Sequence, residues 1–467
     1  MPETAAGGQA GDGPGPPGPG AAPGGAAVVR AATAAPDLAT VYDLTARVFP
    51  GAPAPPDAAA LAAVAARWRR RIEAAAARYP VHVRVAVAPP DVASPPPEIV
   101  GSDVLYEREL RLGPHGEANL RTACIGVVLA HTDRRRAGVG RALMGDAIRF
   151  ARERAFPLLL LGGIPDFYHR FGYADVMERA AHGVDAARLP PESGDPAAGV
   201  TVRPAGEADA PALLALYERH YGARHGGFRR SLDWQRALLA AGPGEPAYLI
   251  AHDAAGAPCA YACLREAEPA RAIEAGAGSW PGALALLRAQ AGLVAASGEP
   301  AATLTWHVPP GRETYFHLAD HLLLTSEIRS RPSAGWLARP AHLPGLFAAL
   351  APALAARWTE SRGAWTGALH LAVVADAATD QPAGACALRL APAACEVDPA
   401  ATAPAPGATP VRLTPDAFTQ LVFGFRPLSW LARRPGCALP DRSHPARAAL
   451  ETLFPARPAW IAGTDHF

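Results

Sequence analysis

The segment RRRAGVG, residues 134–140, carries the residue types that bind phosphate groups. Its two glycines let the backbone turn tightly and approach a ligand closely. The N–H groups at the start of a following helix point at an anion, and the helix dipole favours negative charge there. The flanking arginines would add charge-assisted hydrogen bonds to phosphate oxygens. The alternative is a solvated basic turn that precedes an ordinary helix.

The spacing of the glycines differs from that of the standard nucleotide loops. The segment contains neither G-x-x-x-x-G-K-[ST] nor a full G-x-G-x-x-G. An apolar run precedes it, and apolar residues follow it at helical spacing, namely Val139, Leu143, Ala147 and Ala151. Pro157 ends this helix, and the unbroken LLLL at 158–161 predicts a strand that is buried on both faces of a sheet.

The elements before the loop follow from their hydrophobic periodicity. An Ala-rich stretch at 57–79 predicts a helix, and the alternating VHVRVAVA at 81–88 predicts a strand. Residues 103–112 and 122–130 predict a hairpin around the turn GPHGEAN. We therefore expect the loop to connect a strand of a sheet to a helix.

One internal repeat indicates two domains of the same fold. The segment VVRAATAAPDLATVYDLTARVF at 28–49 resembles TVRPAGEADAPALLALYERHY at 201–221. The matched pairs are Val29 with Val202, Arg30 with Arg203, Asp37 with Asp209, Leu44 with Leu216, Arg47 with Arg219 and Phe49 with Tyr221. The second copy continues with a predicted helix at 281–297 and a strand at 302–308, but it lacks the Arg/Gly loop.

Beyond residue 333 the pattern changes again. LPGLFAALAPALAARW predicts a helix, GALHLAVVAD and GACALRLAP predict strands, and a helix follows Thr414 as a plausible cap. The Gly/Pro/Ala-rich residues 1–25 predict a disordered tail, because they have nothing large to bury. We expect domains at 26–198, 199–332 and 333–467.

Composition excludes several classes of function. The net charge of +1 argues against nucleic-acid binding driven by the charge of the whole protein, although all 44 basic residues are arginine. The six cysteines are scattered, so we expect neither a disulfide framework nor a metal site. We find no signal peptide and no apolar run of membrane length, so no membrane partner is expected and a cytoplasmic location is the default.

These motifs resemble the GNAT superfamily of acetyl-CoA-dependent N-acetyltransferases. The pyrophosphate loop of that family, [Q/R]-x-x-G-x-[G/A] between the fourth strand and the next helix, is matched by Arg135, Gly138 and Gly140. GGIPDFYHRFGYADV at 162–176 resembles the exit of the family's fifth strand. The resemblance implies an α/β (α+β) fold with tandem GNAT domains, whose mixed sheets are flanked by helices. It also implies acetyl-CoA as cosubstrate and no metal.

Site residues carry over by matched position. The backbone of Val128 and Ala130 would bind the pantetheine arm and the thioester, and the amides of 136–141 would bind the pyrophosphate. The implied cofactor-binding set is Val128, Leu129, Ala130, Arg135, Arg136, Ala137, Gly138, Val139, Gly140, Arg141, Gly163 and Ile164. Tyr168 matches the tyrosine that protonates the departing thiolate, a role that suits a neutral phenol. Its alternative role is a packed aromatic in an aromatic-rich segment.

The whole layout resembles the enhanced-intracellular-survival (Eis-like) acetyltransferases, which end in a sterol-carrier-like α+β domain and form hexamers. In that family the terminal carboxylate of a final Phe is the general base, and this sequence ends at Phe467. A terminal carboxyl, with a pKa of about 3.3–3.7, is ionised near neutral pH. The alternative is a frayed terminus, although Trp460 and Ile461 are apolar for a loose tail. His466 departs from the family, which has an acidic residue there.

We therefore expect acetyl transfer from acetyl-CoA to a primary amine by direct attack. The amine would belong to a small molecule, such as an aminoglycoside-like compound, or to a lysine side chain. The sequence does not select between these, and it leaves a second class of function open. In that alternative the C-terminal segment is a lipid-binding carrier module and the acetyltransferase domain is vestigial. The resemblance also predicts a homo-oligomer.

Overall fold

The structure is a computed structural model that describes residues 27–50, 57–88, 98–113, 115–191, 195–240, 247–265, 267–298, 303–332 and 335–466. The predicted tail at 1–25 lies outside these residues. The chain divides into two compact units. Unit 1 comprises Met1–Tyr106 and Ile125–Phe150, and unit 2 comprises Glu107–Cys124 and Ala151–Phe467.

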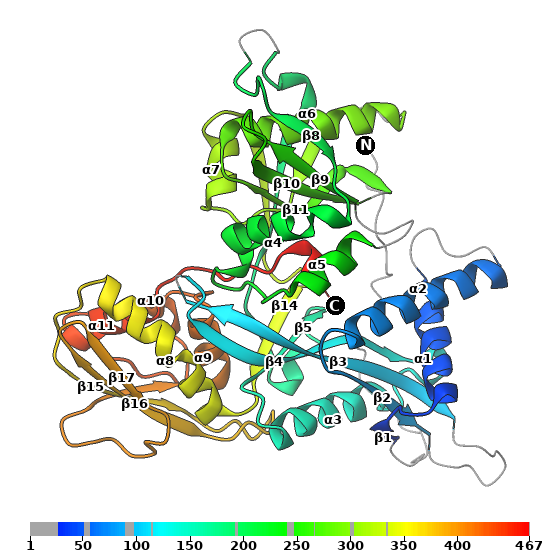
Figure 1. The fold of residues 1–467 in the computed structure, drawn as a ribbon. Helices are drawn as coiled ribbons and strands as arrows, with labels where there is room; N and C mark the ends of the chain where they lie inside the picture. Colours follow the sequence, from blue (N-terminus) through cyan, green and yellow to red (C-terminus); the bar gives the residue numbers. More distant parts are fainter. Residues whose placement is uncertain are drawn as a thin grey trace. The chain divides into compact units, whose positions relative to one another are not determined.

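Unit 1 contains the Arg/Gly loop and the elements that precede it (Figure 1). The elements are β1 (Val28–Ala31), α1 (Ala35–Val48), α2 (Ala58–Ala76), β2 (Val81–Val87), β3 (Ile99–Leu112), β4 (Ala118–Ala130), the 3-10 turn η1 (Thr132–Arg134) and α3 (Val139–Glu153). The ends of β3, β4 and α3 continue into unit 2. The predicted helix, strand, hairpin and post-loop helix are all confirmed.

The first sheet has the strand order β1-β2-β3-β4-β5-β14-β6. Its later strands are β5 (Leu158–Gly163), β6 (Ala174–Asp175) and β14 (Gly335–Pro340). The four leucines that begin β5 are at most 1% exposed, which confirms a strand covered on both faces. The 3-10 turn η2 (His169–Phe171) lies between β5 and β6.

The second sheet, in unit 2, has the order β13-β7-β12-β11-β10-β9-β8. Its strands are β7 (Arg179–Asp185), β8 (Thr201–Pro204), β9 (Ala247–His252), β10 (Pro258–Arg265), β11 (Glu268–Ala277), β12 (Thr303–Trp306) and β13 (Leu324–Arg329). The accompanying helices and turns are η3 (Ala186–Arg188), η4 (Glu207–Asp209), α4 (Ala210–Tyr217), η5 (Glu218–Gly222), α5 (Leu232–Leu239), α6 (Trp280–Ala296) and α7 (Glu313–Ala319).

Alternating side chains on the second sheet bury its two faces against different helices. Ala260 and Ala262 of β10 pack with Leu287 of α6 in one apolar cluster. Tyr261 and Cys263, the intervening residues, pack with residues of α4 in another. This is the two-residue period of a strand, and it encloses the sheet between α6 and α4.

The third sheet, also in unit 2, has the order β17-β16-β15-β18. Its strands are β15 (Gly367–Val373), β16 (Gly384–Ala391), β17 (Ala394–Asp398) and β18 (Thr409–Leu413), and the helices and turn near it in the chain are α8 (Leu343–Glu360), α9 (Pro415–Val422), α10 (Leu428–Leu431), α11 (Pro445–Leu453) and η6 (Gly463–Asp465). Helix α8 packs on this sheet, and Trp358 donates its indole N–H to the carbonyl of Ala391 at 2.7 Å.

Two strands pair with strands outside the domains predicted for them. β7, within the predicted first domain, pairs with β12 and β13 of the second sheet. β14, within the predicted C-terminal domain, pairs with β5 and β6 of the first sheet. The mixed α/β class is confirmed, with two seven-stranded sheets in tandem and a third, separate sheet. The exact domain boundaries remain predictions.

The internal repeat is present in the structure as a repeated ion pair. Arg30 on β1 donates two hydrogen bonds to Asp37, one of them 3.0 Å long. Arg203 on β8 donates two to Asp209, at 2.7 and 2.6 Å. β1 and β8 are the terminal strands of their sheets, so the equivalent residues make the same contact at equivalent places.

The six cysteines are all free. Cys124 and Cys263 are fully buried, and burial raises the pKa of each thiol far above its ordinary value. Among the described residues, no helix is both long and apolar enough to cross a membrane.

A buried ion network holds the C-terminal segment to the second sheet. The guanidinium of Arg230 lies between the carboxylates of Glu274 and Asp465, with N–O distances of 2.9 Å to each. Arg108 donates to Asp465 at 2.8 Å, and so does the hydroxyl of Tyr217, also at 2.8 Å. None of these five side chains is more than slightly exposed, so each charge depends on its partners rather than on water.

Close backbone packing reinforces the network. A Cβ added at Gly463 would lie 2.1 Å from the carbonyl oxygen of Ile273 on β11, so only glycine fits there. Thr464 accepts a hydrogen bond from Arg230 at 2.6 Å and donates one to Glu274. Residues 463–465 are therefore fixed against β11 by packing, hydrogen bonds and charge.

Replacing Asp465→Asn should lower the free energy of unfolding at pH 7 by about 3 kcal/mol, since it leaves Arg230 and Arg108 with one carboxylate fewer. Burial alone would raise the pKa of Asp465, but Arg230 and Arg108 outweigh it and hold the pKa below its ordinary value. The stabilisation is therefore complete above the ordinary pKa and is lost as the pH falls toward the folded-state pKa.

Urea unfolding at pH 7 and at a series of lower pH values checks this prediction. The difference between wild type and Asp465→Asn should shrink on acidification below about pH 4. Asp441→Asn is the matched control, because Asp441 is exposed and should show little effect. Equal stability of the two variants at pH 7 would contradict the role of the network.

Candidate active site

The Arg/Gly loop forms a tight, exposed turn at the start of α3. Its backbone is left-handed at Arg136, with φ of 67°, and at Gly138, with φ of 84°. A residue other than glycine is uncommon in the left-handed region, so the geometry of the turn forces Arg136 into this backbone conformation. A Cβ at Gly138 would meet nothing within 4 Å, which leaves the space above the turn open. The predicted succession of strand, loop and helix is confirmed.

The arginines of the loop are exposed to solvent. Arg134 pairs with Glu98 at 3.3 Å. Within the described ranges, the guanidiniums of Arg135, Arg136 and Arg141 make no hydrogen bond or ion pair. Uncompensated guanidiniums beside the first N–H groups of a helix create a local positive potential that an anion would neutralise.

Close packing within unit 1 fixes the position at which α3 begins. A Cβ added at Gly101 of β3 would lie 2.5 Å from Cγ1 of Val139 and 2.7 Å from the carbonyl oxygen of Leu129. Val139, the first residue of α3, is 3% exposed and packs with Leu143 in the core beneath the helix. Gly101 therefore lets the start of the helix sit directly on β3 and β4.

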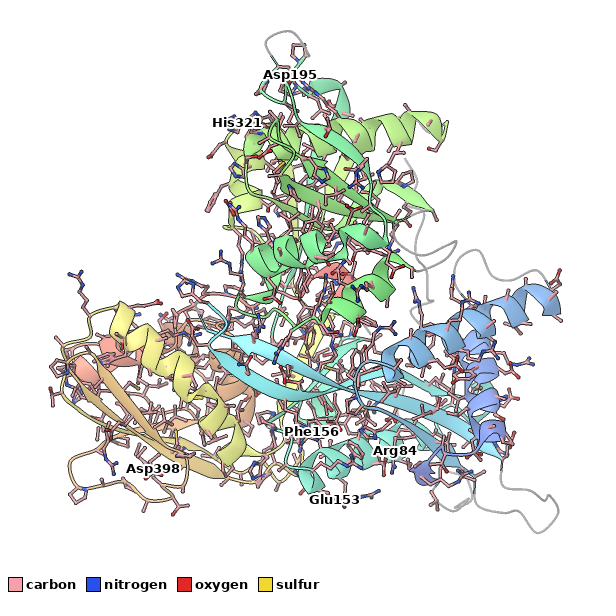
Figure 2. All side chains as sticks on the ribbon, in the orientation of Figure 1. Arg84, Glu153, Phe156, Asp195, His321 and Asp398 are labelled. Carbon is pink, nitrogen blue, oxygen red and sulfur yellow. The ribbon has the colours of Figure 1, made fainter. Side chains whose placement is uncertain are left out.

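Helix α3 is also held by charge. Arg84 of β2, labelled in Figure 2, donates to Asp146 of α3 at 2.7 and 2.9 Å.

Asp103 lies opposite Arg84 on β3 and is fully buried, and its carboxyl oxygens lack hydrogen-bond partners among the described residues. Burial, followed by repulsion from Asp146, raises the pKa of Asp103 well above its ordinary value, which favours the neutral acid.

The backbone of β4 is left-handed at one residue just before the predicted pantetheine-binding residues. Val127 has φ of 55°, an outlier for a β-branched residue. Up to Thr122 the even-numbered residues of β4 are buried, whereas after Val127 the odd-numbered Leu129 is buried and its neighbours Val128 and Ala130 are half-buried. Val128 and Ala130 therefore lie at a partly open face just after this left-handed residue.

Tyr168 follows β5 in unit 2. Its side chain is 8% exposed, and its ring packs edge-on against Phe167, with centroids 4.8 Å apart, and against Tyr173 at 6.2 Å. A Cβ at Gly163 would lie 2.4 Å from Cδ2 of Tyr168, so the ring rests directly on the glycine backbone. Ile164, the next predicted residue, is 54% exposed.

Phe467 lies outside the described residues. The segment before it is well anchored through Asp465, and the ring of His466 meets Trp336 edge-on at 4.8 Å between centroids. Nδ1 of His466 lies 3.4 Å from Nη2 of Arg179. The chain is therefore ordered up to the residue that precedes the predicted base.

The structure brings the predicted residues together in two groups. Val128–Ala130 and 135–141 are connected by one turn in unit 1, and Gly163 contacts Tyr168 in unit 2. The arrangement of these groups with each other and with Phe467 remains a prediction.

Sequence reasoning missed three features of the site. Gly101 and the left-handed backbone at Val127 gave no local signal, because a lone glycine and a valine are ordinary in strands. Asp465 did carry a signal in the sequence, because it lies one position before His466, where the resembled family has an acidic residue. Its importance depends on Arg108 and Arg230, which are distant in the sequence.

Comparisons with known proteins agree with this geometry. Residues 29–176 match the family described as acetyltransferase (GNAT) domain. A GCN5-related N-acetyltransferase from Kribbella flavida is 19% identical, with a TM-score of 0.66 over 95% of this chain and 99% of that chain. A probable N-acyltransferase from Enterococcus faecalis is 15% identical, with a TM-score of 0.67 over 94% and 99%.

A third solved structure, Eis1 from Mycobacterium abscessus, is 16% identical, with a TM-score of 0.57 over 94% of this chain and 100% of that chain. The search of the curated proteins found no match. At these identities the solved structures establish the fold, and the family match establishes the domain. Residues 29–176 therefore match an acetyltransferase (GNAT) domain, and the chain as a whole shares the fold of these solved structures.

Proposed function

We propose that this protein transfers the acetyl group of acetyl-CoA to a primary amine at a site built on the α3 loop. The observation that carries the proposal is the turn at 135–138, which combines guanidiniums without a partner in the described ranges, open space and the start of α3. These are the features that hold a diphosphate. The amides of 136–141 would bind the pyrophosphate of the cofactor.

The chemistry of the site would come from three further parts of the chain. Val128 and Ala130, at the partly open face after Val127, would bind the pantetheine arm and thioester through their backbones. Tyr168 would protonate the departing thiolate, and its packing against Gly163 and Phe167 supports a fixed ring. A preorganised donor needs no reorganisation when the thiolate leaves.

The carboxylate of Phe467 would be the general base for the incoming amine. The anchoring of residues 463–465 by Arg230 supports this role, because a base must be held in one place. We also propose that the protein is of the Eis-like type and that the four-stranded third sheet corresponds to a sterol-carrier-like domain. The acceptor would be an amine of a small molecule or of a lysine side chain.

Gly101→Ala should raise the KM for acetyl-CoA by about tenfold, because the added methyl group displaces the start of α3 and with it the loop amides. Steady-state kinetics that follow free thiol release would measure the change. Gly145→Ala is the matched control. Gly145 lies within α3, a Cβ there meets nothing within 4 Å, and alanine favours the helix. An unchanged KM in Gly101→Ala would argue against cofactor binding at this loop.

Tyr168→Phe should reduce kcat by about 10²–10⁴-fold, the usual contribution of a general acid, while the Kd of CoA stays nearly unchanged. Turnover with a panel of amines and calorimetry with CoA would measure the two quantities. Tyr173→Phe, which alters a ring packed on Tyr168, is the control for packing. If Tyr168→Phe retains full kcat, the phenol is a packed aromatic and not the acid.

Extending the chain beyond Phe467 by a short Gly/Ser tag should abolish most turnover, because it converts the predicted base to an amide. CoA binding should persist, since the loop is untouched. The same tag placed at the N-terminus is the control. Turnover that survives the C-terminal tag unchanged would rule out the carboxylate as base and leave the assignment of the cofactor loop intact.

A further inference from the structure

We propose that unit 2 contains a separate binding site for a small organic anion. A cavity of about 370 Å³ lies against η5, the loop before α7 and residues 457–460. Four arginines line it, namely Arg219, Arg224, Arg312 and Arg457, together with two glutamates, Glu178 and Glu313. This site is independent of acetyl transfer and involves none of the residues assigned to it.

Both glutamates of the cavity are already engaged. Glu313 accepts a hydrogen bond from Arg219 at 2.6 Å. Glu178 accepts one from Ser330 at 2.6 Å and lies 3.4 Å from Arg426, which is not part of the cavity wall. Neither of these two carboxylates is therefore free for the other arginines of the cavity.

Arg224, Arg312 and Arg457 have no carboxylate partner among the described residues. Nε of Arg224 donates to the carbonyl of Arg219 at 3.0 Å, and Nη2 of Arg312 donates to the carbonyl of His225 at 3.1 Å. A carbonyl orients a guanidinium but does not cancel its charge. These contacts hold two positive groups in place at the cavity and leave their charge uncompensated.

The uncompensated charge is unfavourable in the protein as it stands. Burial, followed by repulsion from Arg224, lowers the pKa of Arg312 to about 10, and Arg457 contributes further repulsion. Because desolvated like charges destabilise each other, an anion bound among them would replace repulsion by attraction. Two ring nitrogens, on His220 and Trp460, are also buried without hydrogen-bond partners among the described residues.

The walls indicate the chemical class of the ligand. The cavity volume falls within the range of about 300–1,000 Å³ that is typical of small-molecule sites. Pro309, Pro310 and Ile328 provide apolar surface beside the arginines. Guanidiniums suit bidentate contact with phosphate or carboxylate oxygens. The ligand is therefore a compact organic molecule with an anionic head and an apolar body, rather than an inorganic ion alone.

Calorimetry with phenyl phosphate and with benzoate tests the proposal on the full chain. The two probes share an apolar ring and distinguish a phosphate head from a carboxylate head, and phenol is the uncharged control. The cavity variant is Arg224→Gln with Arg457→Gln. The matched variant is Arg135→Gln with Arg136→Gln, which removes the same charge from the cofactor loop and leaves the cavity intact.

At least one anion should bind the wild-type protein, and phenol should not. The cavity variant should weaken that binding by about tenfold or more, because hydrogen bonds to charged groups are lost, whereas the loop variant should retain it. If the double variant does not fold, Arg457→Gln alone, at an exposed side chain, replaces it. Absence of anion binding, or equal affinity of the cavity variant and wild type, would overturn the proposal. Loss of binding only in the loop variant would also overturn it.

Discussion

The most demanding interaction in unit 2 is the burial of Arg230 between Glu274 and Asp465. Removing a guanidinium and two carboxylates from water is costly, and the cost is recovered only if every charge meets partners with good geometry. Here Arg230 lies in the loop before α5, Glu274 lies on β11 and Asp465 lies in the C-terminal segment. The network therefore specifies one position for residues 463–465, and those residues lead directly to the proposed base.

Arginine is the only strongly basic residue type in this chain. Its side chains occur in three environments, which differ in burial and in whether a carboxylate compensates the charge. Arg230 is buried and matched by carboxylates, so it is structural. Arg135 and Arg136 are exposed and have no carboxylate partner within the described part of the chain, so water stabilises their charge. Arg312 is intermediate, because it is partly removed from water and has no carboxylate partner among the residues that the structure describes. The balance between burial and compensation thus distinguishes a structural arginine from one available to a ligand.

Local patterns predicted the elements of the fold well, because each pattern reflects contacts within a few residues. The alternation at 81–88, the run of leucines at 158–161 and the Arg/Gly turn all appear where the sequence placed them. The strands with which β7 and β14 each pair could not be predicted in this way. Strand pairing between distant segments depends on which sheet edge is free, and a single sequence carries no local record of that.

The site residues illustrate the same limit at a finer scale. Arg135 and Gly138 were identifiable because their side chains or backbone would meet the ligand directly. Gly101 and Gly163 act instead through what they leave out: the first admits Val139 and the second admits the ring of Tyr168. Each close approach involves backbone or a packed ring, so any side chain would displace the element that packs there. The positioning of loop and phenol therefore rests on two glycines whose partners only the folded chain reveals.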